Sequence, residues 1–237
     1  MKALILNSGL GSRMGEITKT HPKCMTEILE EETIVSRQLK LLSKFGISDV
    51  VMTTGPFEDN LKEYCYSLNL GINYTFVNNP NYKDTNYIYS IYCAKDYLED
   101  DIVMMHGDLV FLENVLKGVI ENERSCMVVS STVPLPEKDF KAVVINNKIT
   151  KIGIEYFHNA LAAQPLYKIN KEDWLLWLNT IIDFCENSNF KCYAENAFNE
   201  ISDKCHIYPF DIKDELCNEI DNPEDLERVI KMLRKVM

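Results

Sequence analysis

Short runs of apolar residues alternate with longer amphipathic segments through the first half of the chain. Consecutive apolar residues predict buried strands at 3–6, 49–53, 73–77 and 101–105. Apolar residues spaced three and four apart predict helices over 33–45, 58–68, 87–98 and 112–122. Gly46 and Gly71 lie where the first two of these helices are expected to end. This alternation is typical of a parallel sheet covered by helices on both faces.

The pattern changes after residue 125. Strands are predicted at 126–132, 161–169 and 205–210, and two apolar runs around Asn146-Asn147 predict a hairpin over 141–154. A helix is predicted over 172–186, where Trp174, Trp177 and Phe184 have helical spacing and are expected in the core. Asn222 and Pro223 indicate the start of a last helix running to about Met237. With no repeat or Pro/Gly linker, we expect one mixed α/β unit over 1–237.

Composition sets limits on the partners of this protein. The 237 residues are 46% hydrophobic, enough to bury a sizeable core, and the formal net charge is −11. Such an acidic chain is not expected to bind nucleic acid generally, because phosphates must be neutralised by basic surface. The first 25 residues differ: Lys2, Arg13, Lys19 and Lys23 against Glu16 give a net charge of +3. This local excess indicates an anion site.

The eight cysteines and the apolar segments bear on location. No two cysteines form a C-x-x-C pair, so a zinc motif is not expected. The apolar run after Met1 is too short for a signal peptide, and no stretch approaches the ~18 apolar residues of a membrane span. We expect a soluble cytoplasmic protein with free thiols and no membrane partner.

The strongest local motif follows the first predicted strand. Asn7-Ser8-Gly9-Leu10-Gly11-Ser12-Arg13-Met14-Gly15 is rich in glycine, which lets backbone N–H groups close around an anion. It lacks the G-K-[ST] ending of a Walker loop, and its third glycine is displaced from the dinucleotide fingerprint. The glycines alone are also consistent with an ordinary strand-to-helix turn. Arg13 inside the loop favours contact with a triphosphate.

Three further residues extend this motif. Lys23 follows Pro22 and can reach back over the loop, although a single lysine is more often a solvated surface residue. Asp108, in His106-Gly107-Asp108, follows the fourth predicted strand at the carboxyl edge of the sheet, where open α/β folds bind ligands. Asp221 precedes the last predicted helix. Each aspartate alone could be a turn or cap residue, but together they can bind Mg²⁺.

The loop, Pro22-Lys23, Gly107-Asp108 and Asp221, in this order, resemble the nucleotidyltransferases that act on sugar phosphates and small phosphorylated metabolites. The resemblance extends over nearly the whole chain. Within that group the chain is similar to small cytidylyltransferases of the phosphocholine type, which share the stretch at 86–90 and the late Asp-Asn. It is also similar to the phosphonate and phosphoglutamine enzymes, the last most of all. The resemblance implies a Rossmann-like, mixed but mainly parallel sheet flanked by helices, of the nucleotide-diphospho-sugar transferase type.

The resemblance also implies roles for individual residues. It places the nucleotide against Leu6, Asn7, Ser8, Gly9, Leu10, Gly11, Ser12, Arg13, Lys23 and Gly107. Arg13 and Lys23 would act catalytically on the phosphates of CTP, and Asp108 and Asp221 would bind Mg²⁺ as the cofactor. Residues 1–125 would form the nucleotide-binding half, and 126–237 the acceptor-binding half. The implied reaction transfers CMP to a small phosphorylated acceptor, with phosphoglutamine favoured, in capsular polysaccharide modification.

The acceptor side departs from the phosphocholine pattern. His106 replaces a further acid, so the metal ligands can differ, and the second half shows no clean match to an aromatic choline cage. Tyr and Asn are common in loops, so each acceptor assignment competes with an ordinary loop position. The candidates for acceptor contact are Asn86, Gln164, Tyr167, Tyr193, Glu195 and Asn196.

Charge determines the expected mechanism. The acceptor phosphate is already anionic, so its attack on the α-phosphorus needs alignment and charge neutralisation but no general base. Four alternatives stay open: a phosphocholine or 2-aminoethylphosphonate cytidylyltransferase, a uridylyl- or thymidylyltransferase acting on a hexose 1-phosphate, an NAD-dependent dehydrogenase, and a non-enzymatic nucleotide-binding domain. The displaced glycine and Arg13 argue against the dehydrogenase, and the paired aspartates argue against a mere binder. The sequence leaves the oligomeric state open, a homodimer included.

Overall fold

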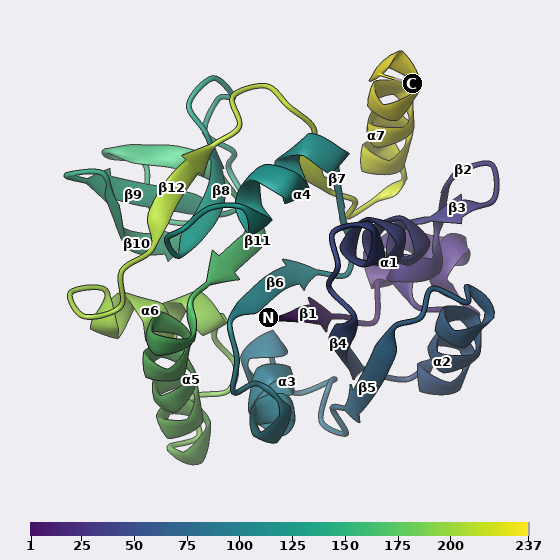
Figure 1. Cartoon of the computed structure of the whole chain (residues 1–237), viewed down its shortest axis with the longest axis horizontal. Coiled ribbons are helices and arrows are strands. Elements are labelled where there is room, and N and C mark those ends of the chain that lie inside the picture. The colour runs from purple at the N-terminus through teal and green to yellow at the C-terminus, as the bar shows by residue number, and fades with distance from the viewer. Residues whose placement is uncertain (237) are drawn as a thin grey trace.

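One mixed sheet forms the centre of the molecule. The computed structural model describes residues 1–236, and within them nine strands form this sheet, with β10-β9-β11-β6-β1-β4-β5 as its main path (Figure 1). Four neighbouring strands run parallel to one another: β1 (Lys2–Leu6), β4 (Asp49–Thr54), β5 (Asn73–Asn78) and β6 (Ile102–His106). The others are β8 (Cys126–Ser130), β9 (Lys141–Ile145), β10 (Lys148–Gly153), β11 (Ala160–Ile169) and β12 (Tyr208–Asp211), which pairs in parallel with β8. β11 joins β6 antiparallel and links the two halves of the chain. The predicted α/β class is confirmed.

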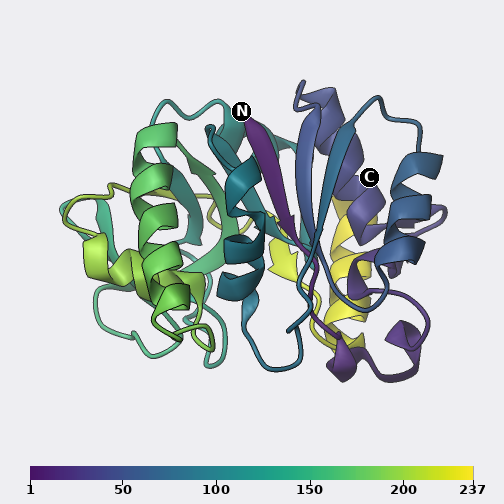
Figure 2. The ribbon, with the colours of Figure 1, turned by 90° about the horizontal axis from the view of Figure 1, so that it is seen from below.

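Helices cover both faces of the sheet. They are α1 (Ile34–Lys44), α2 (Glu58–Ser67), α3 (Tyr87–Ala94), α4 (Glu113–Ile120), α5 (Lys171–Glu186), α6 (Ala194–Ile201) and α7 (Pro223–Val236). One core cluster joins α3, α5 and α6 to one face, and another joins α1, α2 and α4 to the other. Figure 2, seen from the side of α3 and α5, shows these two helices in front of the strands.

The tryptophans of α5 confirm the core prediction. Trp174 and Trp177 are fully buried, and their indole N–H groups donate to the carbonyls of Leu98 and Ala194. Large aromatic side chains contribute much to a core, and a buried indole N–H requires an acceptor. Phe184 is half-buried and packs at the edge of the same cluster. These contacts fix α5 and α6 against the sheet.

Several short elements were not predicted. They are β2 (Glu27–Leu29), β3 (Glu32–Thr33), β7 (Leu109–Phe111), β13 (Cys217–Glu219), α6, and the 3₁₀ helices η1 (Ser12–Thr18), η2 (Lys23–Met25) and η3 (Lys95–Tyr97). The elements of two or three residues are too short to show a hydrophobic period, and the pairing of the short strands depends on their tertiary contacts. The helix predicted over 87–98 ends at Ala94 and continues as η3. Met237, expected in the last helix, lies outside the described residues.

The last helix closes the molecule over the glycine-rich loop. α7 begins with Pro223, Glu224 and Asp225, which suit the first turn of a helix. Its buried Val229 and Leu233 belong to a third core cluster that also contains residues of η1, β2 and α1. This packing brings the segment before α7 beside the loop that follows β1.

Two further findings concern the thiols and the bilayer. All eight cysteines are free, and six of them are buried. Among residues 1–236, no helix has both the length and the apolar composition that crossing a bilayer would require.

Candidate active site

The glycine-rich loop lies between β1 and η1 at the carboxyl edge of the parallel strands. Gly11 caps η1 with a φ of 62°, in the left-handed region that favours glycine. A Cβ at Gly11 would also lie 3.1 Å from Cβ of Lys23, so the loop and the lysine segment are in contact. Thr18 Oγ1 donates to the Gly11 carbonyl at 2.9 Å and fixes the turn. The loop is therefore a defined backbone cradle.

Beneath the loop is a cavity of about 280 Å³, which we call the loop cavity. It brings together most of the residues that the sequence assigned to nucleotide and metal: Leu6, Asn7, Gly9, Leu10, Gly11, Ser12, Arg13, Lys23, Gly107, Asp108 and Asp221. Ser8 lies on an adjoining cavity with Asn86, which we call the Asn86 cavity. A Cβ on Gly107 would lie 1.5 Å from Oδ1 of Asn7, so the β6 turn and the loop pack too closely for a side chain there.

Two cations and two carboxylates meet at the floor of the loop cavity. Lys23 Nζ donates to Asp108 Oδ2 at 2.5 Å and to Asp221 Oδ1 at 2.7 Å. Arg13 Nη2 donates to the same oxygen of Asp221 at 2.8 Å. The Lys23 side chain is 13% exposed and that of Arg13 is 69% exposed. The lysine is thus enclosed between the carboxylates, whereas the arginine is mostly exposed and contacts only Asp221 of the two.

Burial and pairing act against each other at this cluster. Burial lowers the pKa of Lys23, but the charges and hydrogen bonds of Asp108 and Asp221 outweigh it and leave the pKa raised. Burial raises the pKa of Asp108, but Lys23 and His106 outweigh it and leave the pKa lowered. The lysine is therefore cationic and the aspartate anionic at neutral pH, the states required to bind a phosphate and a metal ion.

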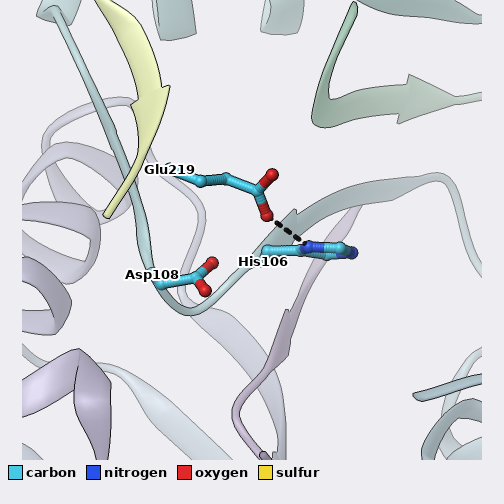
Figure 3. Close-up of side chains that lie close together, drawn as sticks. All are labelled: His106, Asp108 and Glu219. Atoms are coloured by element: carbon cyan, nitrogen blue, oxygen red, sulfur yellow. Dashed lines mark hydrogen bonds and ion pairs between the residues drawn. The ribbon is translucent and has the colours of Figure 1, made fainter. Parts of the chain in front are cut away.

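A second pair lies beside Asp108. His106 ends β6 and Glu219 ends β13, and His106 Nδ1 lies 2.8 Å from Glu219 Oε1 (Figure 3). Burial lowers the pKa of His106, but the hydrogen bond and charge of Glu219, then the charge of Asp108, raise it to about 8. Burial and the charge of Asp108 raise the pKa of Glu219, against the opposing effect of His106. The pair is coupled to the Asp108 carboxylate.

The donor atoms of this region suit a divalent cation. Ligand atoms of His106, Asp108 and Glu219 lie within 4.8 Å of one another. The Asp221 carboxylate is linked to this group because Lys23 Nζ donates to both Asp108 and Asp221. Asp108 Oδ1 is buried without a hydrogen-bond partner, so an oxygen lone pair is available for coordination. Carboxylate oxygens are the ligands Mg²⁺ prefers. The residues present therefore fit the magnesium ion that the resemblance implies.

A third cavity, of about 240 Å³, opens on the other side of the carboxylates. We call it the aromatic cavity, because the rings of Tyr87, Phe140 and Tyr193 line it together with the imidazole of His106. The ring centroids of Phe140 and Tyr193 are 5.1 Å apart, and those of Tyr87 and Tyr193 are 5.9 Å apart. The aromatic cavity shares Arg13, Asp108 and Asp221 with the loop cavity, so one ligand spanning both would pass over these two carboxylates.

The residues predicted for acceptor contact take different places. Tyr193 lines the aromatic cavity and Asn86 lines the Asn86 cavity. Glu195 is buried behind Tyr87, to which it is hydrogen-bonded. Asn196 caps α6, its Oδ1 accepting from Tyr193 N at 3.0 Å, and lines a separate surface hollow. Gln164 lines none of the three cavities just described.

Sequence reasoning missed Glu219, Tyr87 and Phe140. Glu219 enters the site because β13 pairs with β7, directly after Asp108, and Ile220 N donates to the Asp108 carbonyl at 3.0 Å. The sequence does contain one signal for Glu219. Residues two apart in an extended segment share a face, and Glu219 is two residues before Asp221. The aromatic wall had no such signal, because its three rings come from distant segments.

Known proteins resemble this chain in sequence and in fold. The profile described as "MobA-like NTP transferase domain" matches residues 3–136. The CTP:phosphoglutamine cytidylyltransferase of Campylobacter jejuni is 29% identical over 54% of this chain and 52% of its own length. This chain thus spans about half the length of that relative. The choline-phosphate cytidylyltransferase of Haemophilus influenzae is 24% identical over 98% of this chain and 97% of its own.

A solved structure extends the comparison to the fold. The CTP:phosphocholine cytidylyltransferase from Streptococcus pneumoniae superposes with a TM-score of 0.79 over 98% of each chain, at 18% identity. Its similarity confirms the predicted fold type, a mainly parallel sheet flanked by helices. The family resemblance inferred from the motifs is confirmed by the profile match.

Proposed function

Since this chain belongs to the MobA-like NTP transferase family, we propose that it is a cytidylyltransferase. It transfers CMP from CTP to a small phosphorylated metabolite and releases pyrophosphate. Phosphoglutamine is the favoured acceptor, because the matched relatives include a phosphoglutamine enzyme. The motif resemblance favours capsular polysaccharide modification as the context. The observation that supports this proposal is the cluster of Lys23, Arg13, Asp108 and Asp221 beneath the glycine-rich loop.

The residues of the cluster supply charge and alignment. The loop backbone receives the nucleotide, and Arg13 and Lys23 neutralise its phosphates. Asp108 and Asp221, with Glu219 beside them, would bind Mg²⁺, which when bound polarises the α-phosphate and orients the attacking oxygen. The acceptor phosphate attacks the α-phosphorus directly, so no residue needs to remove a proton. The aromatic cavity receives the organic part of the acceptor.

Pyrophosphate release tests the proposal. The protein is incubated with each NTP, Mg²⁺ and a panel of phosphoglutamine, phosphocholine, 2-aminoethylphosphonate and hexose 1-phosphates. We expect turnover with CTP and one of the first three acceptors, and we expect Lys23→Ala and Asp108→Ala to lower it by at least about 100-fold while remaining folded. Lys19→Ala is the matched control, because Lys19 is 64% exposed and pairs with Glu16 alone.

Three outcomes would contradict the proposal. Turnover only with a hexose 1-phosphate would replace the cytidylyltransferase by a sugar nucleotidyltransferase. No pyrophosphate from any NTP would indicate a binding domain. Full activity of Lys23→Ala or Asp108→Ala would remove the assigned roles.

A further inference from the structure

Gln38 is a buried glutamine of α1 whose side chain reaches the turn that carries Asp108. It is 1% exposed. Its Nε2 group donates to the carbonyl of His106 at 2.9 Å and to the carbonyl of Leu109 at 2.8 Å. These two carbonyls flank Gly107 and Asp108 in the chain. One amide group of α1 therefore bridges the two ends of the turn between β6 and β7.

The two carbonyls also determine the orientation of the Gln38 amide. An NH₂ group has two hydrogens and can donate to both carbonyls, whereas the amide oxygen in its place would face two acceptors. In the observed orientation Oε1 of Gln38 is buried and has no hydrogen-bond partner within residues 1–236. A buried polar atom without a partner costs free energy, and an apolar side chain would avoid that cost. Packing of α1 alone does not explain a glutamine at this position.

The segment before α7 holds the same turn from the other side. Ile220 N donates to the Asp108 carbonyl at 3.0 Å, where β13 pairs with β7. Hydrogen bonds alternate along an antiparallel pair, so the carbonyl of the next residue, Leu109, points away from β13. Gln38 supplies its donor from α1. The backbone of Asp108 is thus fixed between α1 and β13.

This turn carries two of the three side chains that gather at the candidate cation site. Ligand atoms of His106, Asp108 and Glu219 lie within 4.8 Å of one another, and Oδ1 of Asp108 is buried without a hydrogen-bond partner. Figure 3 shows His106 and Asp108 on the same stretch of backbone, with Glu219 facing them. A shift of the backbone between His106 and Leu109 would therefore move the ligand atoms apart.

We propose that Gln38 is a positioning residue, which fixes the turn so that His106 and Asp108 keep their ligand atoms within reach of one divalent cation. Gln38 lines none of the three cavities, so it acts through the backbone and touches neither substrate nor cation. This inference rests on the proposed function, because it assumes that Asp108 binds the cation of the reaction.

An apolar side chain of similar length in place of the amide tests the inference. Gln38→Met removes both hydrogen bonds to the turn and preserves most of the side-chain volume. We expect the Kd for Mn²⁺, measured by EPR without nucleotide, to rise by about 10- to 100-fold. We expect kcat for pyrophosphate release to fall by at least about 10-fold, because the carboxylate is displaced. KM for the acceptor should stay unchanged, because Gln38 lies outside the cavity linings.

Two neighbouring residues of α1 provide matched controls. Arg37→Met removes the hydrogen bond that Arg37 Nε donates to the Phe111 carbonyl at 3.1 Å, farther along β7. Ser36→Ala removes the capping box that Ser36 forms with Thr33 at the start of α1. Both variants should lower the free energy of unfolding, because each loses hydrogen bonds of α1. Neither touches the turn, so the Kd for Mn²⁺ and kcat should keep their wild-type values.

Gln38→Glu extends the test to the case in which Gln38→Met does not fold. Glutamate has the size of glutamine, and burial opposite two carbonyls favours its protonated form, which can donate to one of them. We therefore expect the Kd for Mn²⁺ and kcat to change in the same directions as in Gln38→Met, by smaller factors.

The outcomes distinguish this inference from the proposed function. A wild-type Kd for Mn²⁺ together with a wild-type kcat in Gln38→Met, or in Gln38→Glu if only that variant folds, overturns the positioning role and leaves the transferase intact. Equal losses in Arg37→Met or Ser36→Ala would also overturn it, because they would assign the effect to the stability of α1. No pyrophosphate from any NTP contradicts the proposed function, whereas the Mn²⁺ titration still decides the role of Gln38.

Discussion

The pair of His106 and Glu219 makes the stability of the protein depend on pH. Burial lowers the pKa of His106, but the hydrogen bond and charge of Glu219, with smaller contributions from the charges of Asp108 and Glu195, raise it from its ordinary 6.5 to about 8. The side chains of His106 and Glu219 are 15% and 20% exposed, so solvent screens their interaction little. At about 1.4 kcal/mol per pH unit, this difference corresponds to about 2 kcal/mol of folding free energy.

The sign follows from the direction of the change. The folded protein holds the His106 proton more tightly than the unfolded chain, so this stabilisation is fully present below pH 6.5 and is lost as pH rises through about 8. In Glu219→Gln this anion is gone, so the pKa of His106 falls, because burial then opposes only the charges of Asp108 and Glu195. The wild-type advantage over the variant should therefore be larger at pH 6 than at pH 9, by up to about 2 kcal/mol.

At high pH the wild-type protein loses its stability advantage over Glu219→Gln. The pKa of Glu219 is raised by burial and by Asp108, so its ionised form is unfavourable once His106 is neutral. Glu219→Gln relieves that repulsion, and at pH 9 we expect it to be at least as stable as the wild type.

Urea unfolding at pH 6 and pH 9 gives the free energies, and NMR titration of the His106 ring gives its pKa directly. His158→Gln is the control, because His158 is exposed and lines none of the three cavities. A stability difference that is the same at both pH values, or a His106 pKa unchanged in Glu219→Gln, would refute the reasoning.

Two further predictions concern the loop and the lysine. The Lys23 ammonium lies between Asp108 and Asp221. In the absence of nucleotide, Lys23→Met should therefore bind Mn²⁺ more tightly than the wild-type protein, as measured by EPR with Lys19→Met as the control. Equal or weaker binding of Mn²⁺ would contradict this prediction. A Cβ at Gly55 would lie 2.5 Å from the Ser8 carbonyl, so Gly55→Ala should lower the free energy of unfolding by about 1–3 kcal/mol and raise KM for CTP. An unchanged free energy of unfolding in urea would contradict this prediction, because it would show that the loop accommodates the added Cβ at little cost.

The features that the sequence revealed are those encoded by neighbouring residues. The parallel strands show consecutive apolar residues, and the glycine-rich loop is one contiguous motif, so both were predicted close to their observed positions. Lys23, Asp108 and Asp221 were grouped because each follows or precedes a recognisable element, and the structure brings them into direct contact.

The features that the sequence did not reveal depend on tertiary contacts. β7 and β13 are three residues each, and only their pairing places Glu219 beside His106. The aromatic wall combines the start of α3, the residue before β9 and the cap of α6, which no local period connects. Glu195 was predicted as a candidate for acceptor contact, and only the packing of α6 shows that it is buried.

The span of chain between the ion-pair partners has a consequence for biosynthesis. Arg13 and Lys23 lie 208 and 198 residues from Asp221, the carboxylate that joins them. Closing a loop of this length is slow and costs conformational entropy, so these contacts form only after the intervening sheet has been assembled. A ribosome-bound chain from which the segment before α7 has not yet emerged has the glycine-rich loop but lacks this carboxylate. The cluster of Arg13, Lys23 and Asp221 therefore forms as one of the last events of folding.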